Sequence, residues 1–447
     1  MKKTLLAAAT AAALAPLAAH ATDGYYQHGY GIKAKGRAGA GTAMATDAFG
    51  GANNPASMAF VGNRLDFGVD LFSPIREAAR AGGLAGIDGQ AESDSNLHLI
   101  PEFGYNKTIN PDMSLGVTVY ANGGMNTDYP GGQIPSGTAC GPATGPGTGF
   151  NPAPGPYNLL CGNGSLGVDL AQLVIAPTLA YKINPNHAFG ISPLIGIQSF
   201  EAQGLQAFAG FSTSPNDLTN KGHDTAYGYG VRVGWFGRLS EAVSIGAAYS
   251  TKIYMTEFDK YKGLFAGEGD FDMPENYNVG IAFKATPRLT VLADYRRINY
   301  GDIASVGNPS ASVVNCSLVG GTDPSTCLGG SNGAGFGWRD VNAYKIAFEY
   351  QYSSELTLRA GYSHNDNPIR AQDVTFNIIA PGVIEDHLAL GFTYQRKSGG
   401  ELTMYYMHAF ENEVTGPSLF NSFGVPAGNE TIKMYQNSLG IAYGWQF

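Results

Sequence analysis

The sequence contains few charged residues and, beyond its N-terminus, no long apolar run. Charged residues make up 14% of the 447 residues, whereas about 25% is usual for a soluble domain. No apolar run after residue 21 approaches the roughly 18 residues that a membrane-spanning helix needs. The formal net charge is −9, and proteins that bind nucleic acid need an excess of basic residues to neutralise phosphates. Helical membrane proteins and nucleic-acid-binding proteins are therefore excluded.

Glycine and aromatic residues are abundant instead. The chain has 62 glycines, 25 tyrosines and 23 phenylalanines, and this glycine content is about twice the usual ~7%. A collagen-like or disordered chain does not carry so many aromatic side chains. The composition therefore favours a folded protein.

The first 21 residues have the form of a secretory signal peptide. Met1-Lys2-Lys3 is basic, Thr4–Leu17 is apolar and rich in alanine, and Ala19-His20-Ala21 fits the A-x-A pattern of a cleavage site. We expect cleavage at 1–21 and export across a bacterial-type inner membrane. Loss of the two lysines then changes the formal charge from −9 to −11. An ordinary N-terminal helix is the alternative interpretation.

The four cysteines would enter an oxidising compartment on export. Cys140 and Cys161 lie in one segment rich in glycine and proline, and Cys316 and Cys327 lie in another. Four cysteines allow three disulfide connectivities, of which pairing within each segment is the simplest. No pair has the CxxC spacing of zinc or redox sites. Each bridge would stabilise the folded state by about 3 kcal/mol if it forms without strain.

Apolar side chains alternate with small or polar ones along several segments, which is the period of a β-strand. In the last thirteen residues one face carries Tyr435, Asn437, Leu439, Ile441, Tyr443, Trp445 and Phe447, and the other carries Gln436, Ser438, Gly440, Ala442, Gly444 and Gln446. Segments 289–296, 344–351 and 356–363 alternate in the same way. A soluble sheet with its apolar face inward would show the same alternation.

The spacing of the segments decides between these two folds. Short gaps of two to five residues alternate strictly with long gaps of 14 to 43 residues. An even number of strands with short turns at one end and long loops at the other is typical of outer-membrane barrels, in which closure leaves no unpaired edge. The sequence therefore predicts an all-β, 14-stranded antiparallel transmembrane β-barrel over 63–447. Its predicted strands are 63–73, 97–107, 113–123, 167–182, 187–203, 225–238, 242–256, 271–285, 288–300, 340–352, 355–365, 383–397, 401–412 and 435–447.

The alternation of short and long gaps also predicts the topology. We expect the short turns and both termini on the periplasmic side, and the long loops with all four cysteines outside the cell. The last strand ends in Phe447, which resembles the terminal assembly signal of bacterial outer-membrane barrels. The expected partners are therefore the barrel assembly machinery, outer-membrane lipid and lipopolysaccharide. We expect a monomer that binds no nucleic acid.

Residues 22–62 precede any strand-like alternation and are too polar to face lipid. They contain a run of small residues, Gly36–Thr46, followed by Asn53-Asn54-Pro55-Ala56. Small residues allow the backbone to pack closely against a barrel wall, and a fourteen-stranded barrel would otherwise approach the width of an open aqueous channel. We therefore favour an N-terminal plug, or hatch, inside the lumen at 22–62. A disordered periplasmic tail is the alternative.

An ordered series of motifs along the mature chain resembles the FadL-type outer-membrane transporters. Asn54-Pro55-Ala56 is similar to the family's hatch motif, although alone it is a weak signal. It is followed by Tyr120–Gly124 with Asp128-Tyr129-Pro130, by Met273-Pro274-Glu275, by Gly337–Asp340, and by Leu358–Tyr362 with Asp366–Ile369. The long insertions that carry the cysteines, 124–166 and 301–339, depart from the family pattern.

This resemblance implies a channel for hydrophobic solutes, either long-chain fatty acids or aromatic and aliphatic hydrocarbons, with a detergent-like amphiphile as a further possible ligand. In the family an apolar groove between the third and fourth external loops collects the solute; here those loops are 204–224 and 257–270. The corresponding entry residues are Leu205, Phe208, Phe211, Tyr261, Leu264 and Phe265. Each CH₂ that such a groove buries contributes about 0.8 kcal/mol. Loops that merely pack on themselves are the alternative.

The resemblance also implies a sideways exit through the wall where the third strand kinks. Asn122, Gly123 and Gly124 end that predicted strand, and glycine weakens a strand and permits a kink. An ordinary strand-to-loop turn explains the same residues. In the family the hatch shifts to open the inner path, and Asn54, Pro55 and Ala56 would belong to the moving element. A turn fixed by the proline is the structural alternative.

Charged residues on the predicted inner faces have two interpretations. A salt-bridged network between wall and plug is favoured, and a carboxylate-binding arginine is the alternative if the ligand is a fatty acid. The candidates are Arg232, Asp294, Arg296, Lys345, Glu349 and Arg359.

No catalytic residues, cofactor or metal site are expected, because the G-x-S-x-G match at 329–333 lies in a loop and the eight histidines show no ligand spacing. Two other functions stay open: a general diffusion porin for polar solutes, and an adhesin or outer-membrane enzyme.

Overall fold

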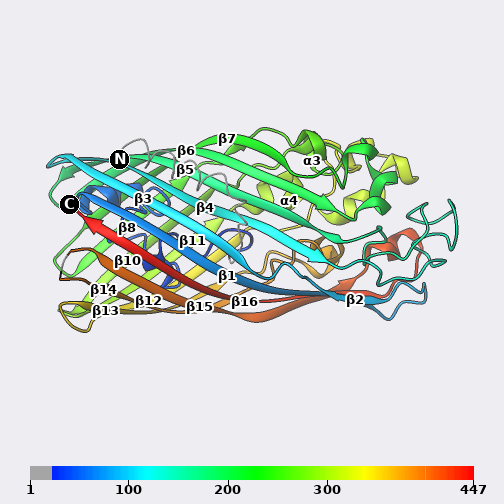
Figure 1. Ribbon diagram of the computed structural model, residues 1–447. Coiled ribbons are helices and arrows are strands. Elements are labelled where there is room, and N and C mark those ends of the chain that lie inside the picture. Colours follow the sequence, from blue (N-terminus) through cyan, green and yellow to red (C-terminus); the bar gives the residue numbers. More distant parts are fainter. Residues whose placement is uncertain (1–22, 398) are drawn as a thin grey trace, which may run out of the picture.

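The computed structural model describes residues 23–397 and 399–447. Within these residues fourteen long strands form one antiparallel sheet, which closes where β1 (Arg64–Ala81) pairs with β16 (Asn429–Gln446) (Figure 1). The strands between them are β3 (His98–Asn110), β4 (Met113–Tyr129), β5 (Leu166–Asn184), β6 (His187–Gln203), β7 (Asp224–Arg238), β8 (Val243–Ser250), β10 (Asn276–Thr286), β11 (Leu289–Ile298), β12 (Val341–Gln351), β13 (Leu356–Asn365), β14 (Asp386–Gln395) and β15 (Glu401–Pro417). Two short strands, β2 (Gly89–Glu92) and β9 (Tyr254–Met255), pair with β1 and β7. The predicted fourteen-stranded barrel is confirmed.

The wall has its apolar face outward, which is the reverse of a soluble sheet. On β16 the side chains of Leu439 and Ile441 are exposed, whereas Gln436 and Ser438 are buried. The other strands follow the same rule, and the exposed set includes Phe67, Phe189, Ile191, Val279, Phe283, Tyr344, Ile346, Phe348 and Leu390. Such an apolar outer band over a polar interior suits a barrel that is surrounded by lipid.

The two ends of the barrel differ. Consecutive strands are joined at one end by short turns, such as those between β3 and β4 and between β5 and β6, and the C-terminus lies at this end (Figure 1). The long loops lie at the opposite end together with α3 (Ala266–Gly269) and α4 (Ala304–Gly307). None of the described helices has the length and apolar character to cross a membrane.

The remaining described helices are short and lie in the N-terminal segment and the loops. They are α2 (Ile32–Lys35) and α5 (Val374–Asn377), with the 3-10 helices η1 (Pro55–Phe60), η2 (Gln206–Phe211), η3 (Pro215–Asp217), η4 (Asp259–Tyr261), η5 (Tyr300–Asp302), η6 (Ser310–Asn315), η7 (Ser317–Val319), η8 (Pro324–Thr326), η9 (Ala371–Asp373) and η10 (Leu419–Phe423). The predicted signal peptide, 1–21, lies outside the described residues.

Several strand ends differ from the predicted bounds. β1 continues to Ala81 rather than ending at residue 73, and β16 begins at Asn429 rather than 435, because these two strands pair in unbroken register over their full length. The predicted strand 242–256 divides into β8 and β9, with residues 251–253 between them. β10 begins at Asn276 rather than 271, since Pro274 just before it has no N–H to donate.

Candidate functional site

Residues 23–62 form a segment whose charged side chains are buried and paired with the barrel wall. Lys35 Nζ lies 3.0 Å from Asp70 Oδ2 on β1 and 3.3 Å from Glu102 Oε2 on β3. Arg37 donates to Glu349 on β12 at 2.9 Å. Buried charges of this kind are tolerated only with partners of good geometry. These pairs fix the segment to β1, β3 and β12.

Asp23 and Asp294 anchor the segment to β11 and β12. The Asp23 carboxylate lies 2.9 Å from Lys345 Nζ and 3.4 Å from Arg296 Nη1. Asp294 accepts hydrogen bonds from two successive backbone N–H groups of the segment, at 2.9 and 2.8 Å. With Arg232, which donates to backbone carbonyls of the segment, the candidate luminal charges form a network between segment and wall.

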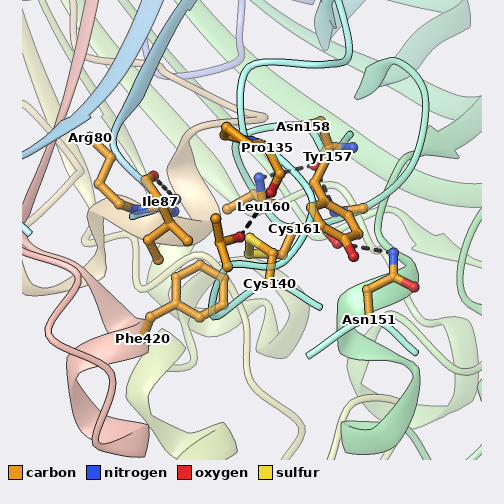
Figure 2. Close-up of a disulfide and its surroundings, with 12 residues drawn as sticks. Arg80, Ile87, Pro135, Cys140, Asn151, Tyr157, Asn158, Leu160, Cys161 and Phe420 are labelled. Carbon is orange, nitrogen blue, oxygen red and sulfur yellow. Dashed lines mark hydrogen bonds between the residues drawn. A yellow bond between two sulfur atoms is a disulfide. The ribbon is translucent and has the colours of Figure 1, made fainter. Parts of the chain in front are cut away.

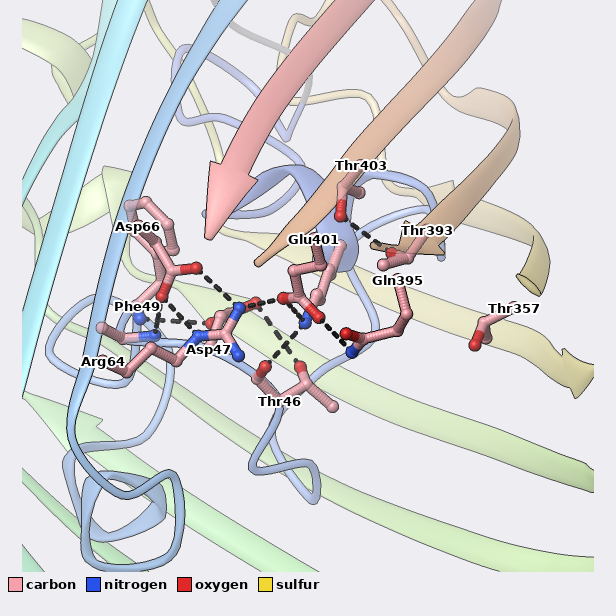
Figure 3. A network of polar contacts seen from close by, with 12 residues as sticks. Thr46, Asp47, Phe49, Arg64, Asp66, Thr357, Thr393, Gln395, Glu401 and Thr403 are labelled. Atoms are coloured by element: carbon pink, nitrogen blue, oxygen red, sulfur yellow. Dashed lines mark hydrogen bonds and ion pairs between the residues drawn. The ribbon is translucent and has the colours of Figure 1, made fainter. Parts of the chain in front are cut away.

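A third group of contacts joins β1 to β15 across β16, which lies between them in the sheet (Figure 3). Arg64 donates two hydrogen bonds to Asp66, both at 2.7 Å, and also contacts Glu401. Lys33 of the segment forms an ion pair with the same Glu401. The backbone N–H of Ala48 donates to Asp66 at 2.9 Å. The carboxylates of Asp66 and Glu401 each have partners on both the segment and the wall. This network therefore joins the segment to β1 and β15.

The motif Asn54-Pro55-Ala56 lies buried against β6, β7 and β8. Asn54 has extended backbone geometry and caps η1, accepting the Ala56 N–H at 3.1 Å. Its amide nitrogen donates to the Thr42 carbonyl at 3.0 Å and to the Trp235 carbonyl of β7 at 2.9 Å. One side chain therefore caps a helix, closes a loop within the segment and joins the segment to the wall.

Two glycines in the wall make this approach possible. A Cβ at Gly234 of β7 would collide with the Asn54 side chain, and a Cβ at Gly190 of β6 would collide with the Pro55 backbone. The wall thus offers a surface of backbone atoms at the place where η1 packs, as expected for a close approach of backbone to backbone.

The wall is interrupted at the upper part of β4. β3 and β4 pair only from Phe103↔Val119 to Asn110↔Met113, so residues 98–102 of β3 pair with β1 alone and residues 120–129 of β4 pair with β5 alone among the described strands. The β4–β5 register shifts by one residue at Asn122, which is a β-bulge. The bulge falls within the predicted kink, Asn122 to Gly124.

The N-terminal segment occupies this unpaired edge of β4. Gly124 N donates to the Tyr25 carbonyl at 3.0 Å, and Gln27 N donates to the Asn122 carbonyl at 3.2 Å. Tyr26 and Gly123 form an isolated antiparallel bridge. Backbone groups that a neighbouring strand would ordinarily satisfy are here satisfied by a short stretch of the segment, residues 25–27.

The predicted entry residues come together around a small apolar cavity of about 40 Å³. Leu205, Phe208, Leu264 and Phe265 line it, and Phe211 and Tyr261 belong to the same buried cluster. The exposure expected of a groove is not observed, since five of the six side chains are buried. The cavity therefore lies between packed loops rather than in an exposed groove.

The two long loops that carry the cysteines cover the apolar cavity. Leu160 contributes from the loop before β5, and Leu328 and Phe336 contribute from the loop before β12. The structure joins Cys140 to Cys161 and Cys316 to Cys327. The first disulfide lies beside Arg80 and Phe420, whose guanidinium and ring are 4.8 Å apart (Figure 2). The insertions that depart from the family pattern are thus the segments that close the cavity.

A second, smaller cavity of about 30 Å³ lies beside the wall interruption. It is lined by Tyr25 of the segment, by Gly124 and Met125 of β4, and by Trp338 and Arg76 among others. Aromatic rings connect it to the first cavity: the Phe265 and Phe271 centroids are 4.8 Å apart, and Phe271 and Tyr25 are 6.1 Å apart. Tyr25 therefore stands between the loop cavity and the interrupted wall.

Sequence reasoning missed Tyr25, Arg76 and Trp338 as lining residues. Arg76 falls in a stretch, Arg-Glu-Ala-Ala-Arg-Ala, that lacks clear alternation, although its even-numbered position places it on the inner face of β1. Tyr25 was missed because, apart from the adjacent Tyr26, its ring partners are more than two hundred residues away. The described residues contain no group of three or more His, Cys, Asp or Glu side chains that could hold a metal ion.

Comparison with known proteins agrees with this geometry. Three solved structures share the fold: the P. putida toluene transporter TodX (17% identity, 94% of this chain and 99% of that chain, TM-score 0.64), a Pseudomonas aeruginosa FadL homologue (16%, 95% and 100%, TM-score 0.65) and the Ralstonia pickettii toluene transporter TbuX (16%, 94% and 99%, TM-score 0.59). No curated protein matches the chain in sequence. At these identities the structural likeness shows the fold alone.

A match to a family model shows which family the chain belongs to. The model described as "Outer membrane protein transport protein (OMPP1/FadL/TodX)" matches residues 158–416, which is more than half of the chain. The chain belongs to the OMPP1/FadL/TodX family of outer membrane transport proteins.

Proposed function

We propose that the protein is an outer-membrane channel for the uptake of hydrophobic solutes, either long-chain fatty acids or aromatic and aliphatic hydrocarbons, by passive diffusion. One observation carries this proposal: the barrel has a polar interior, yet the loops at one end pack around an apolar cavity lined by residues such as Phe208 and Phe265. An apolar lining of this kind is typical of small-molecule sites. Transfer of an apolar solute from water into such a cavity is favourable by about 25 cal/mol per Å² of buried apolar surface.

The proposed topology places the long loops outside the cell and the short turns with the C-terminus in the periplasm. The cavity between the loops then receives solute from outside. Residues 22–62 act as the hatch after removal of the signal peptide at 1–21. The ion pairs of Lys35, Arg37 and Asp23 with the wall support this role, because they fix the segment across the bore.

The proposed exit is sideways, through the wall beside β4. A solute that moved straight down the bore would have to displace buried ion pairs, which is costly because charges would lose their partners in a low-dielectric environment. In the described chain the unpaired edge at residues 120–129 is bonded to the segment, to loop residues and to Arg76 of β1, with no strand paired beside it. Displacement of Tyr25 from its ring contacts would join the loop cavity to this edge.

An uptake experiment tests the proposal. Cells that lack their own transporter and express this protein should accumulate a labelled apolar solute faster than cells with the empty vector. Liposomes that contain the purified protein should not become permeable to a small sugar, since the segment fills the bore. Sugar permeation without apolar uptake would instead support a diffusion porin, and neither activity would support an adhesin or another role.

Replacement of Asn54, Pro55 and Ala56 together tests the hatch. We expect uptake to fall while the barrel still assembles, because η1 loses its cap and its link to β7. Assembly is measured by heat-dependent gel migration of the folded barrel. Unchanged uptake by a correctly assembled variant would exclude the hatch role of this motif.

A further inference from the structure

Arg76 is a buried cation without a counter-charge. Five of the seven buried arginines in the described chain lie within 4 Å of a carboxylate; Arg76 and Arg232 do not. Arg232 is occupied by carbonyls of the N-terminal segment. Arg76 also leaves its Nε without a hydrogen-bond partner. A charge taken out of water without an ionic partner is costly, so a compensating role is expected for it.

The partners that Arg76 does have are neutral oxygens, one on β4 across the wall interruption and two in residues 95–96, just before β3. Its guanidinium contacts the Asn126 carbonyl of β4 and the Ser95 carbonyl, and it donates to Asn96 Oδ1 at 3.2 Å. Arg76 itself lies on β1. It therefore bridges β1 to β4 at the level where β3 no longer pairs with β4.

The space next to Arg76 is apolar. The cavity that it lines is otherwise formed by Tyr25, Met125, Trp338, Pro381 and Met434, together with small residues and Asn126. A single cation in an apolar cavity fits a molecule with one anionic group and an apolar body. A planar guanidinium binds a carboxylate through two parallel hydrogen bonds, which neutral carbonyls do not match in strength.

We propose that Arg76 binds the carboxylate of an acidic amphiphile at the wall interruption and so selects organic carboxylates over neutral hydrocarbons. This inference rests on the proposed function as a channel for apolar solutes. The apolar tail lies among Tyr25, Met125 and Trp338. The carboxylate supplies the missing counter-charge and replaces the Asn126 and Ser95 carbonyls as the partner of Arg76.

Trp338 provides the readout, because it lines the same cavity. Trp235 and Trp445 are replaced by Phe so that Trp338 alone reports binding in protein held in amphipol. Octanoate and 1-octanol are titrated at neutral pH, where octanoate is ionised and octanol is not. Arg76→Gln should weaken octanoate binding by about tenfold or more, and octanol binding should change less than twofold. Arg76→Lys keeps the charge and should lie between wild type and the Gln variant.

The exposed Arg339, next to Trp338 in sequence, provides a matched control. Arg339→Gln removes the same charge from the chain, and it should leave the binding of both ligands within twofold. Equal loss of octanoate and octanol in Arg76→Gln, or loss of neither, would overturn the proposal. If Arg76→Gln does not fold, the wild type still tests the proposal. The proposal requires the wild type to bind octanoate at least as tightly as the more apolar octanol. Binding of octanol without a preference for octanoate refutes only the role of Arg76, whereas binding of neither refutes the proposed function as well.

Discussion

The Asn54 side chain offers the sharpest test of how the N-terminal segment is held. Asn54→Ala removes three hydrogen bonds, to the Thr42 carbonyl, to the Trp235 carbonyl and from the Ala56 N–H. A typical buried hydrogen bond contributes about 1 kcal/mol net, and loss of an N-cap costs a similar amount. Only the bond to Trp235 joins η1 to the wall, so Asn54→Ala should favour release of η1 from the wall by about 1 kcal/mol. Since 1.4 kcal/mol is a factor of ten, the released population should rise about fivefold.

Single-channel recording in planar bilayers measures this release. The wild type should be closed to ions nearly all the time, and Asn54→Ala should show brief conducting events whose total duration is about fivefold longer. Asn53→Ala is the matched control, because Asn53 donates to the Tyr30 and Phe49 carbonyls within the segment and its side chain does not donate to the wall. A folded Asn54→Ala variant that remains as closed as wild type would refute the reasoning.

Three further predictions follow from the wall, the loops and the loop carboxylates. Deletion of Asn122 restores the β4–β5 register and should lower uptake severalfold in the cell assay; unchanged uptake would show that the bulge is not needed. Replacement of Cys316 and Cys327 by Ser removes about 3 kcal/mol of loop constraint and should speed proteolysis within 301–339 without altering barrel migration on gels, whereas equal proteolysis would contradict the covering role. Burial and the Asp272 carboxylate raise the pKa of Asp270 to about 6. The protonated form is therefore favoured in the folded loops, whose stability should decline as pH rises through about 6. Asp270→Asn should abolish this decline in amide exchange of residues 258–272, and an unchanged pH profile would argue against it.

The barrel could be predicted from the sequence because the patterns that indicate it are local. Alternation such as Leu439 and Ile441 against Ser438 and Gly440 is written within one strand, and the lengths of turns and loops are read directly from the chain. Strand ends were less accessible. The extension of β1 to Ala81 depends on a register with β16, more than three hundred residues away.

The site could be predicted only in part, because its contacts also join residues that are far apart in the chain. The entry residues could be named because their loops follow from the strand count, but their burial could not, since the cover comes from Leu328 and Phe336 in another loop. Arg76 illustrates the remaining difficulty. Its significance lies in the lack of a carboxylate around it, and a sequence gives no direct sign of which charges remain unpaired after folding.

The proposed direction of transport follows from where polarity lies in the molecule. The bore contains buried ion pairs such as Lys35–Asp70 and Asp23–Lys345, so an apolar solute gains nothing by entering it and would disrupt costly pairs. The outer wall is apolar, and the edge of β4 that β3 leaves unpaired is bonded to residues 25–27, residues 93–94 and Arg76, among others. Under the proposed function an apolar solute in the loop cavity meets a lower barrier sideways, into lipid, than along the axis. Under the same proposal the N-terminal segment both seals the bore and controls the lateral path, because it contributes Tyr25, whose movement would connect the cavity to the wall.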